Sequence, residues 1–432
     1  MKKLLLALLC VLLTAGFAFA VDVDLKGMYN SRGTYIDNSS GLGYDSDTAY
    51  DYFYLDMELD LTARLLVTDK TRVIVNMEIH DENWATDGVA NQDDRAEEDG
   101  RGLDDNIHFK RVFSSHTFDA YGTVLDLGLM TGGAWGTGFG DSARGKYRIK
   151  VSQPTELGPV IAIYEKNAEL GSTQKDAEKD DGNAYYLAMV TKLGDFNIMP
   201  LIGYVDASNV PPLDQGSDGL KKTLFLLAAN ATFGDIGFEA EFDYVQDDFD
   251  NVSVDDKDSY FGVYGNGWWN IGAGKVGLLA AYGSWSDDLG NGFGFGEDFT
   301  PTVFGADWTN IGGNSATSSD NQFSGRTWSE YKAVSMVQLY GSLALSEELS
   351  ISGSGLYWAS NADENADGTN NYWKDSDGYE IDLGLAWKIT DAVTYSIAAG
   401  FGKISLDDSG TGVVDDSPDA FARAYHKFQI DF

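Results

Sequence analysis

Hydrophobic and polar residues alternate with a period of two along much of this chain. Between Phe53 and Leu65 every odd position is apolar, and the even positions include Asp56, Glu58 and Asp60. Successive side chains of a β-strand point to opposite faces, so such a segment has one apolar face and one charged face. Two further segments with this pattern are 236–244 and 379–388.

The lengths of the connections alternate as well. Short turns, such as Gly194-Asp195 and Gly234-Asp235, are followed by long loops rich in Asp, Asn and Gly. Apolar-out, polar-in strands of about ten residues with such connections are typical of membrane barrels. The sequence therefore predicts an all-β fold: a transmembrane antiparallel up-and-down β-barrel with short periplasmic turns and long extracellular loops.

Hairpin counting along the chain gives 18 strands, with 16 as the alternative. The weakest parts of this count are the glycine-rich segment 131–145 and the loop 286–330. A barrel of about 16–18 strands is wide enough to hold a water-filled channel. The predicted strands are 22–34, 51–66, 71–81, 106–117, 121–131, 145–153, 159–167, 184–193, 196–205, 222–233, 236–247, 259–271, 275–285, 331–345, 349–359, 379–389, 393–405 and 420–432.

The N-terminal residues have the pattern of a secretory signal peptide. Lys2 and Lys3 precede a short apolar run, and Ala18-Phe19-Ala20 supplies a small-x-small cleavage site. We therefore expect residues 1–20 to be removed and residues 21–432 to form the barrel domain. Cleavage would also remove Cys10, the one cysteine, so no disulfide is expected. The remaining sequence has no uninterrupted apolar stretch of about 18 residues, which excludes a helical membrane protein.

Composition narrows the class of partner. The chain has 68 acidic and 30 basic residues, a formal net charge of −38. Such an excess of carboxylates repels phosphates, which argues against nucleic-acid partners and favours attraction of cations. Disorder does not explain the acidity, because 13% of the residues are aromatic and only 7 are proline.

The C-terminal segment alternates up to an aromatic last residue. Phe428, Ile430 and Phe432 are separated by polar residues. In this feature, and in its predicted signal peptide and hairpin repeat, the chain resembles the outer-membrane porins of Gram-negative bacteria. The resemblance implies an integral protein of the outer membrane, in contact with lipid and lipopolysaccharide and assembled as a homotrimer. It also implies that the three apolar residues are an assembly signal for the barrel-assembly machinery.

In porins the third extracellular loop folds inward and narrows the channel. The matching loop here is 131–144, followed by a strand whose basic residues share one face. These bases either form a transverse electric field across the lumen with Asp141, the carboxylate of the loop, or simply keep the lumen polar. The candidate constriction residues are Trp135, Asp141, Arg144, Lys146, Arg148 and Lys150.

Charged residues also occupy the predicted inward face of other strands. The candidate lumen charges are Asp56, Glu58, Asp60, Arg64, Arg72, Glu78, Glu239, Glu241, Asp243, Glu380 and Asp382. Acids outnumber bases in this set, and loop 83–105 adds more carboxylates. A negative wall and mouth concentrate cations, so the sequence predicts a cation preference, most pronounced at low salt.

Two motifs leave alternatives open. Asp363, Asn365 and Asp367 match the opening of a calcium loop, but Lys374 stands where the bidentate Glu belongs. We expect no cofactor beyond loosely bound Ca²⁺ in the acidic loops. Tryptophans near the strand ends fit interfacial girdles or a sugar-stacking surface, and only one of the adjacent Trp268 and Trp269 can face the lumen.

These patterns predict a channel for passive diffusion of small hydrophilic solutes and cations. The alternatives are a substrate-specific channel, for example for sugars, and a non-conducting surface adhesin or structural barrel. An enzyme is not expected, because the four histidines lack metal-ligand spacing and no serine lies in a G-x-S-x-G motif.

Overall fold

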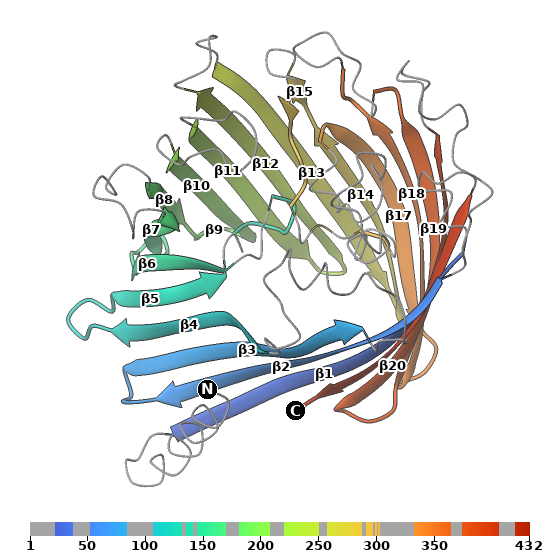
Figure 1. The fold of residues 1–432 in the computed structure, drawn as a ribbon, viewed down its shortest axis with the longest axis horizontal. Helices are drawn as coiled ribbons and strands as arrows, with labels where there is room; N and C mark the ends of the chain where they lie inside the picture. The colour runs from blue at the N-terminus through green and yellow to red at the C-terminus, as the bar shows by residue number, and fades with distance from the viewer. Residues whose placement is uncertain are drawn as a thin grey trace.

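A computed structural model places an antiparallel ring of strands around a central lumen (Figure 1). It describes residues 22–37, 52–83, 107–131, 135–140, 145–169, 181–207, 220–249, 257–286, 291–296, 299, 301–302, 332–363, 374–405 and 420–432. The predicted signal peptide lies outside these residues. No helix in these ranges is long and apolar enough to cross a membrane.

The wall strands follow one another around the ring in chain order. They are β1 (Asp22–Asp37), β2 (Tyr52–Leu66), β3 (Thr71–Asn83), β4 (Ile107–Thr117), β5 (Val124–Thr131), β6 (Gly145–Gln153), β7 (Val160–Glu169), β8 (Asp181–Met189), β9 (Thr191–Leu193), β10 (Phe196–Ala207), β11 (Leu220–Phe233), β12 (Ile236–Phe249), β13 (Lys257–Ile271), β14 (Gly274–Gly283), β17 (Val334–Ala344), β18 (Leu349–Ser360), β19 (Asp377–Lys388), β20 (Val393–Ser405) and β21 (Phe421–Asp431).

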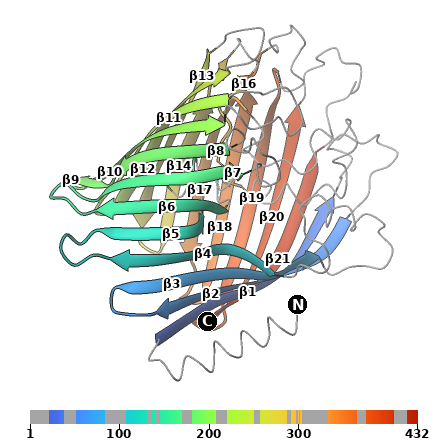
Figure 2. The ribbon, with the colours of Figure 1, turned by 60° about the vertical axis from the view of Figure 1, so that its left-hand side comes forward.

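The barrel is closed and has 18 wall positions. Strands β8 and β9 both pair with β10 and are separated only at Val190, so together they occupy one position. The ring closes where β21 pairs with β1, beside which the C-terminus lies (Figure 2). There Gly27 and Phe432 exchange backbone hydrogen bonds of 2.7 and 2.9 Å. The predicted barrel and its count of 18 strands are confirmed.

Side chains alternate between the two faces of the wall, as the sequence predicts. In β13, Tyr260 and Tyr264 are buried inside the barrel, whereas Phe261 and Val263 are exposed on its outer surface. An apolar outer surface is what lipid chains require, and the inward positions are free to carry charge. Closure also leaves no strand edge with unpaired backbone groups, which a membrane does not tolerate.

Short connections join the strands at one end of the barrel. Three of them begin with a glycine at positive φ: Gly194 (63°), Gly234 (60°) and Gly272 (59°). A two-residue hairpin of type II′ requires this conformation at its first central residue, and glycine adopts it without strain. The long loops predicted for the other end lie mostly outside the described residues.

Two strand predictions need correction. Strand β5 begins at Val124 rather than at 121, because the turn after β4 runs through Gly122, whose φ is +65°. The loop predicted at 286–330 contains part of a hairpin, formed by β15 (Trp285–Ser286) and β16 (Asn291–Gly292), that stands apart from the barrel sheet. This second difference matters for the lumen, because the residues after this hairpin fold inward.

Candidate functional site

The inward faces of the strands form two unlike walls. The charged wall consists of the inward faces of β21 and of β1 to β7, where acidic and basic side chains lie side by side. The covered wall consists of the inward faces of β11 to β14, β17 and β18. Strands β3 and β13 are half a turn apart in the ring of 18, so the walls face each other across the lumen.

Lys110 of β4 lies at the centre of the charged wall. Its Nζ is 3.2 Å from Glu58 Oε1 and 3.3 Å from Asp60 Oδ2, and it also forms an ion pair with Glu78. Asn76 donates a hydrogen bond of 2.5 Å to Asp60. Three of the predicted lumen carboxylates therefore share one ammonium group, which offsets one of their three formal negative charges.

A β-bulge turns Lys110 inward. Asn76 of β3 is paired with Arg111, but the next residue, Met77, is paired with Phe109, so Lys110 is the extra residue on β4. A bulge re-aims side chains and breaks the alternation of faces. Sequence analysis missed Lys110 for this reason. The sequence does contain a signal of the bulge, because two adjacent basic residues, Lys110 and Arg111, interrupt the alternation of apolar and polar positions.

The bases of β6 face inward, as predicted, and two of them are paired. Arg148 donates through Nε and Nη2 to Glu165, both at 2.6 Å, and Lys150 lies 3.3 Å from Asp126. Among the described residues Lys146 has no ion pair, so its charge is available to the lumen. Asp141 and Arg144 lie outside the described residues, and the transverse field with Asp141 stays a prediction.

The remaining candidates on the charged wall are near its ends. Arg64 lies 3.8 Å from Asp24, and both side chains are about half exposed. Arg72 is exposed close to the short-turn end, where its cross-strand partner is Ser115. The side chain of Asp56 is outside the described part of the chain.

On the covered wall, Glu241 holds an inward-folded segment. Its carboxylate accepts hydrogen bonds from the backbone N–H groups of Thr137 (2.6 Å) and Gly140 (3.1 Å). Trp135 donates from Nε1 to the carbonyl of Met199 at 3.2 Å. The predicted inward loop therefore exists in its described part, residues 135–140, and it lies against β10 and β12.

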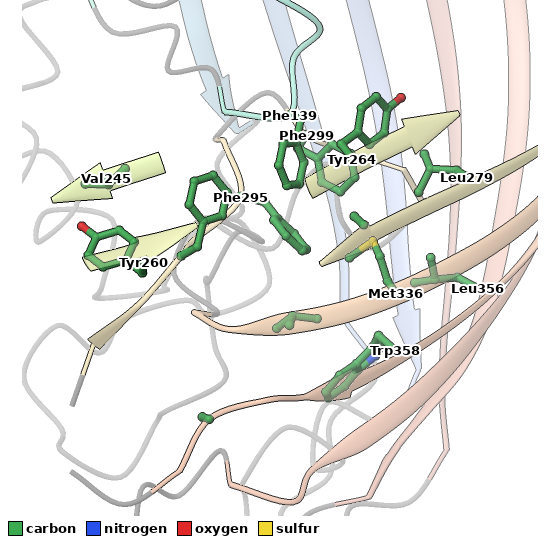
Figure 3. Close-up of a cluster of buried hydrophobic side chains, with 14 residues drawn as sticks. Phe139, Val245, Tyr260, Tyr264, Leu279, Phe295, Phe299, Met336, Leu356 and Trp358 are labelled. Atoms are coloured by element: carbon green, nitrogen blue, oxygen red, sulfur yellow. The ribbon is translucent and has the colours of Figure 1, made fainter. Parts of the chain in front are cut away.

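A second segment, which sequence analysis treated as an extracellular loop, packs against the first. Phe139 lies among Phe293, Phe295, Phe299 and Tyr264, with ring centroids 5.0–5.5 Å away (Figure 3). The N–H of Gly296 donates to the carbonyl of Phe139 at 2.6 Å. We call residues 135–140 and the described residues of 285–302 the inner loops.

The inner loops form an apolar core inside the barrel. Phe139 and Phe295 are both 1% exposed, and Gln338 of β17 donates at 2.5 Å to the carbonyl of Pro301. Both segments contain Gly-Phe-Gly, at 138–140 and 294–296. The same tripeptide also occurs at 400–402 in wall strand β20, so it does not by itself identify an inner loop.

Most of the predicted lumen acids of β12 and β19 are buried rather than facing water. Glu241 is 2% exposed and Asp243 is 5% exposed. Glu239 accepts hydrogen bonds from Tyr264 (2.6 Å) and Asn266 (3.1 Å). On β19, Glu380 and Asp382 are also buried, and Ser354 donates to Asp382 at 2.8 Å. These five carboxylates have the predicted inward direction, but their environment limits what they contribute to a field in the lumen.

The metal and assembly candidates lie away from the lumen centre. The Nζ of Lys374 is 2.5 Å from Asp363, so the lysine that breaks the calcium motif neutralises its first carboxylate. Asn365 and Asp367 lie outside the described residues, within which no cluster of three potential metal ligands occurs. The apolar side chains of Phe428, Ile430 and Phe432 lie on the outer face of β21, and their role in assembly stays a prediction.

No protein-family model and no curated protein matches this chain. Among solved structures, OccK2 (OpdF) of Pseudomonas aeruginosa is similar, with a TM-score of 0.52 and 8% identity over 95% of this chain and 98% of that one. OccK1 (OpdK) of the same organism has a TM-score of 0.51 and 12% identity over the same shares. OmpT of Vibrio cholerae with loop L8 deleted has a TM-score of 0.44 and 13% identity, over 96% of this chain and all of that one.

At sequence identities this low, the structural similarity shows a shared fold and nothing more. OpdK is described as an outer-membrane protein, and the similarity extends over 95% of this chain and 98% of that one. The resemblance to outer-membrane porins that the sequence suggests is therefore confirmed at the level of the fold.

Proposed function

We propose that this protein is an outer-membrane channel through which small hydrophilic solutes diffuse passively. The observation that best supports this proposal is the charged wall. Its inward side chains include the exposed Arg72 and Arg111 and also Lys146, for which the described residues supply no ion pair, and a sealed apolar interior would not accommodate them. The inner loops pack against the opposite wall, where Phe139, Phe295 and Phe299 join its apolar side chains (Figure 3).

We further propose that ion selectivity is set at the mouth rather than in the lumen. Of the nine predicted lumen acids, three share Lys110, five on β12 and β19 are buried or hydrogen bonded, and the side chain of Asp56 lies outside the described part of the chain. We propose that the carboxylates that attract cations are mainly those of the predicted extracellular loops. Exposed charges act over a Debye length of about 8 Å at physiological salt and about 3 Å at 1 M. We therefore expect a cation preference at low salt that fades as salt rises.

The test is a planar-bilayer measurement on refolded protein under a KCl gradient. The proposal expects stable conductance steps and a reversal potential that favours K⁺ at low ionic strength and approaches zero preference near 1 M. Absence of any current from protein that is demonstrably folded, judged by heat-sensitive gel mobility, would refute the channel and support a structural or adhesive barrel. A constant cation preference at all salt concentrations would instead place the selectivity filter inside the lumen.

Location and assembly follow from the same proposal. An apolar outer belt facing lipid, closed by β21 on β1, fits insertion into the outer membrane after export. We propose a homotrimer on the resemblance to porins, and contact of the acidic loops with lipopolysaccharide through divalent cations. Cross-linking in native membranes, followed by gel electrophoresis, tests the oligomeric state.

A further inference from the structure

Two basic side chains lie near each other on the charged wall without a carboxylate of their own. Arg111 of β4 and Lys146 of β6 both point into the lumen, and β5 runs between their strands (Figure 2). Arg111 is exposed, and Lys146 is partly exposed. Neither forms an ion pair with any residue that the structure describes. We call Arg111 and Lys146 the basic pair.

The bases that follow Lys146 along β6 already have partners. Arg148 donates two hydrogen bonds of 2.6 Å to Glu165, and Lys150 lies 3.3 Å from Asp126. Each of these two carboxylates therefore neutralises a base of its own. On this side the basic pair keeps its charge.

On the other side of the pair, the carboxylates are held by Lys110. Lys110 lies 3.3 Å from Asp60 and also forms an ion pair with Glu78. Asn76 is the cross-strand neighbour of Arg111, and it donates its amide hydrogens toward β2, at 2.5 Å to Asp60. Asn76 therefore separates Arg111 from the carboxylates of β2. The described surroundings leave the basic pair with two formal positive charges.

Met130 of β5 indicates how the two side chains are arranged. Met130 is paired with Lys146, and the pairing of Val112 with Leu129 places Arg111 on its other side. Neighbouring strands are about 4.8 Å apart, so the two bases leave the wall about 10 Å from each other. The Met130 side chain points inward but is only 7% exposed. Long basic side chains cover apolar surface with their stems, and stems that lean over Met130 bring the two charged ends together.

From this arrangement we propose that the basic pair is a binding site for phosphate monoesters, such as sugar phosphates. A phosphate monoester carries a charge of about −1.5 to −2 near pH 7 and has three acceptor oxygens. Arginine donates to two phosphate oxygens at once, and lysine adds a compact positive charge. A carboxylate or a sulfate ester carries one negative charge and would neutralise only one of the two bases.

The position of the basic pair gives this site a use in an acidic channel. Both residues lie toward the long-loop end of their strands, since β4 begins at Ile107 and β6 at Gly145. The chain has a formal net charge of −38, which repels phosphates. A local pair of positive charges offsets this repulsion at one place on the path. The site rests on the proposed channel, because a solute reaches it only through an open lumen.

The experiment records single-channel current in KCl at neutral pH before and after addition of glucose phosphate, with glucose sulfate and glucose in parallel. Both esters carry their anionic group on the primary hydroxyl, so they have the same shape and differ by about one charge. Glucose phosphate is expected to interrupt the current in a saturable manner at concentrations about tenfold lower than glucose sulfate, and glucose should have no effect there.

Equal potency of the two esters overturns the site, as does the absence of any interruption in a channel that conducts KCl. Absence of the KCl current itself, in demonstrably folded protein, would overturn the channel. The two failures are therefore distinguishable.

Three variants of the charged wall locate the site. Arg111→Gln and Lys146→Gln should each weaken the interruption by glucose phosphate about tenfold and reduce its advantage over glucose sulfate. Arg72→Gln is the matched control, because Arg72 is also an exposed inward base but lies alone near the short-turn end, opposite Ser115. The control should change the interruption by less than about twofold.

Arg111→Lys separates charge from geometry. It keeps the positive charge but removes the fork that donates to two oxygens, so its loss should lie between that of Arg111→Gln and none. Folding of each variant is checked by heat-sensitive gel mobility. An equal loss in Arg72→Gln would mean that any lumen base attracts phosphate, and an unchanged preference for phosphate over sulfate in Arg111→Gln and Lys146→Gln would also overturn the proposal.

Discussion

The charged wall and the covered wall are both built from alternating strands, but their inward polar side chains find their partners in different ways. On the charged wall, inward polar groups pair with one another across neighbouring strands, as Lys110 does with the carboxylates of β2 and β3. On the covered wall, the inward groups are matched by other segments of the chain, as Glu241 is by the backbone of 135–140. One wall therefore leaves charge available to the lumen, whereas the other supplies a surface on which loops are fixed.

This difference separates two tasks that a channel must combine. A barrel of 18 strands is wide, and without inner segments its lumen would discriminate little by size. Backbone amides and aromatic rings hold the inner loops on the covered wall, so in the proposed channel the passage beside them would be bounded by charged side chains. The predictions below disturb one wall or the other, in order of expected effect.

The largest effect is expected from Phe139→Ala. Removing a buried aromatic side chain lowers stability by about 3–5 kcal/mol. Here the lost interactions are those that hold the two inner loops together. The loops should separate from each other, and single-channel conductance should rise and become noisier, while the barrel remains folded.

Phe242→Ala is the control for this change, because it removes an outward ring that is 37% exposed. Its conductance should match that of the unmodified protein. If Phe139→Ala also left conductance unchanged in folded barrels, the inner loops would not define the passage.

The next effect is expected on the charged wall, from Lys110→Met. The change leaves Glu58, Asp60 and Glu78 together without their shared cation, and buried or half-buried carboxylates then repel one another. We expect a stronger cation preference, measured as a shift of the reversal potential, and lower resistance to urea.

Lys257→Met serves for comparison, since it removes the same charge from an exposed rim residue 3.1 Å from Asp248. Only a small, salt-sensitive shift of the reversal potential is expected there. Equal shifts for the two variants would mean that the Lys110 cluster does not face the ion path.

A moderate effect is expected from Gly140→Ala on the covered wall. A Cβ atom at this position would lie 2.5 Å from Asp243 Oδ2, so the segment 135–140 has to move away from β12. The hydrogen bond from the Gly140 N–H to Glu241 should lengthen, and conductance should rise by less than in Phe139→Ala.

Gly267→Ala adds the same methyl group where no atom lies within 4 Å. This variant should conduct like the unmodified protein. A conductance increase of similar size in both glycine variants would show that the effect is not specific to the loop contact.

The smallest effect is expected outside both walls, in the turn between β19 and β20. Asp391 accepts a hydrogen bond from Lys388, with N and O 2.7 Å apart, which holds the pKa of this carboxyl below its usual range. A lowered pKa stabilises the folded state at pH values above the pKa of the unfolded chain, and that contribution is lost as pH falls through the lowered value.

Because Asp391 is fully exposed, solvent screens this pair. Asp391→Asn should therefore leave conductance unchanged and produce no measurable change in urea resistance at pH 7. A clear loss of stability at pH 7 that is absent at pH 3 would contradict this expectation.

The sequence by itself determined the wall of this protein. Alternation indicated which face of each strand is apolar, and the turn glycines and polar loops indicated roughly where the strands end. All 18 predicted wall strands are therefore present, although some of their ends differ from the predicted ones, as at β5. These features are local, because a period of two and a positive φ depend only on neighbouring residues. The inward direction of Glu241, Glu380 and Lys150 followed from the same rule.

The tertiary structure decided what those inward side chains meet. No local pattern shows that three carboxylates share Lys110, because a bulge reverses the alternation at that residue. Nor does the sequence near Glu241 reveal that the backbone of residues more than 100 positions earlier fills its pocket. Pairing across a closed ring and inward folding of loops join distant residues, and the free energy of those contacts depends on packing that exists only once the barrel has closed.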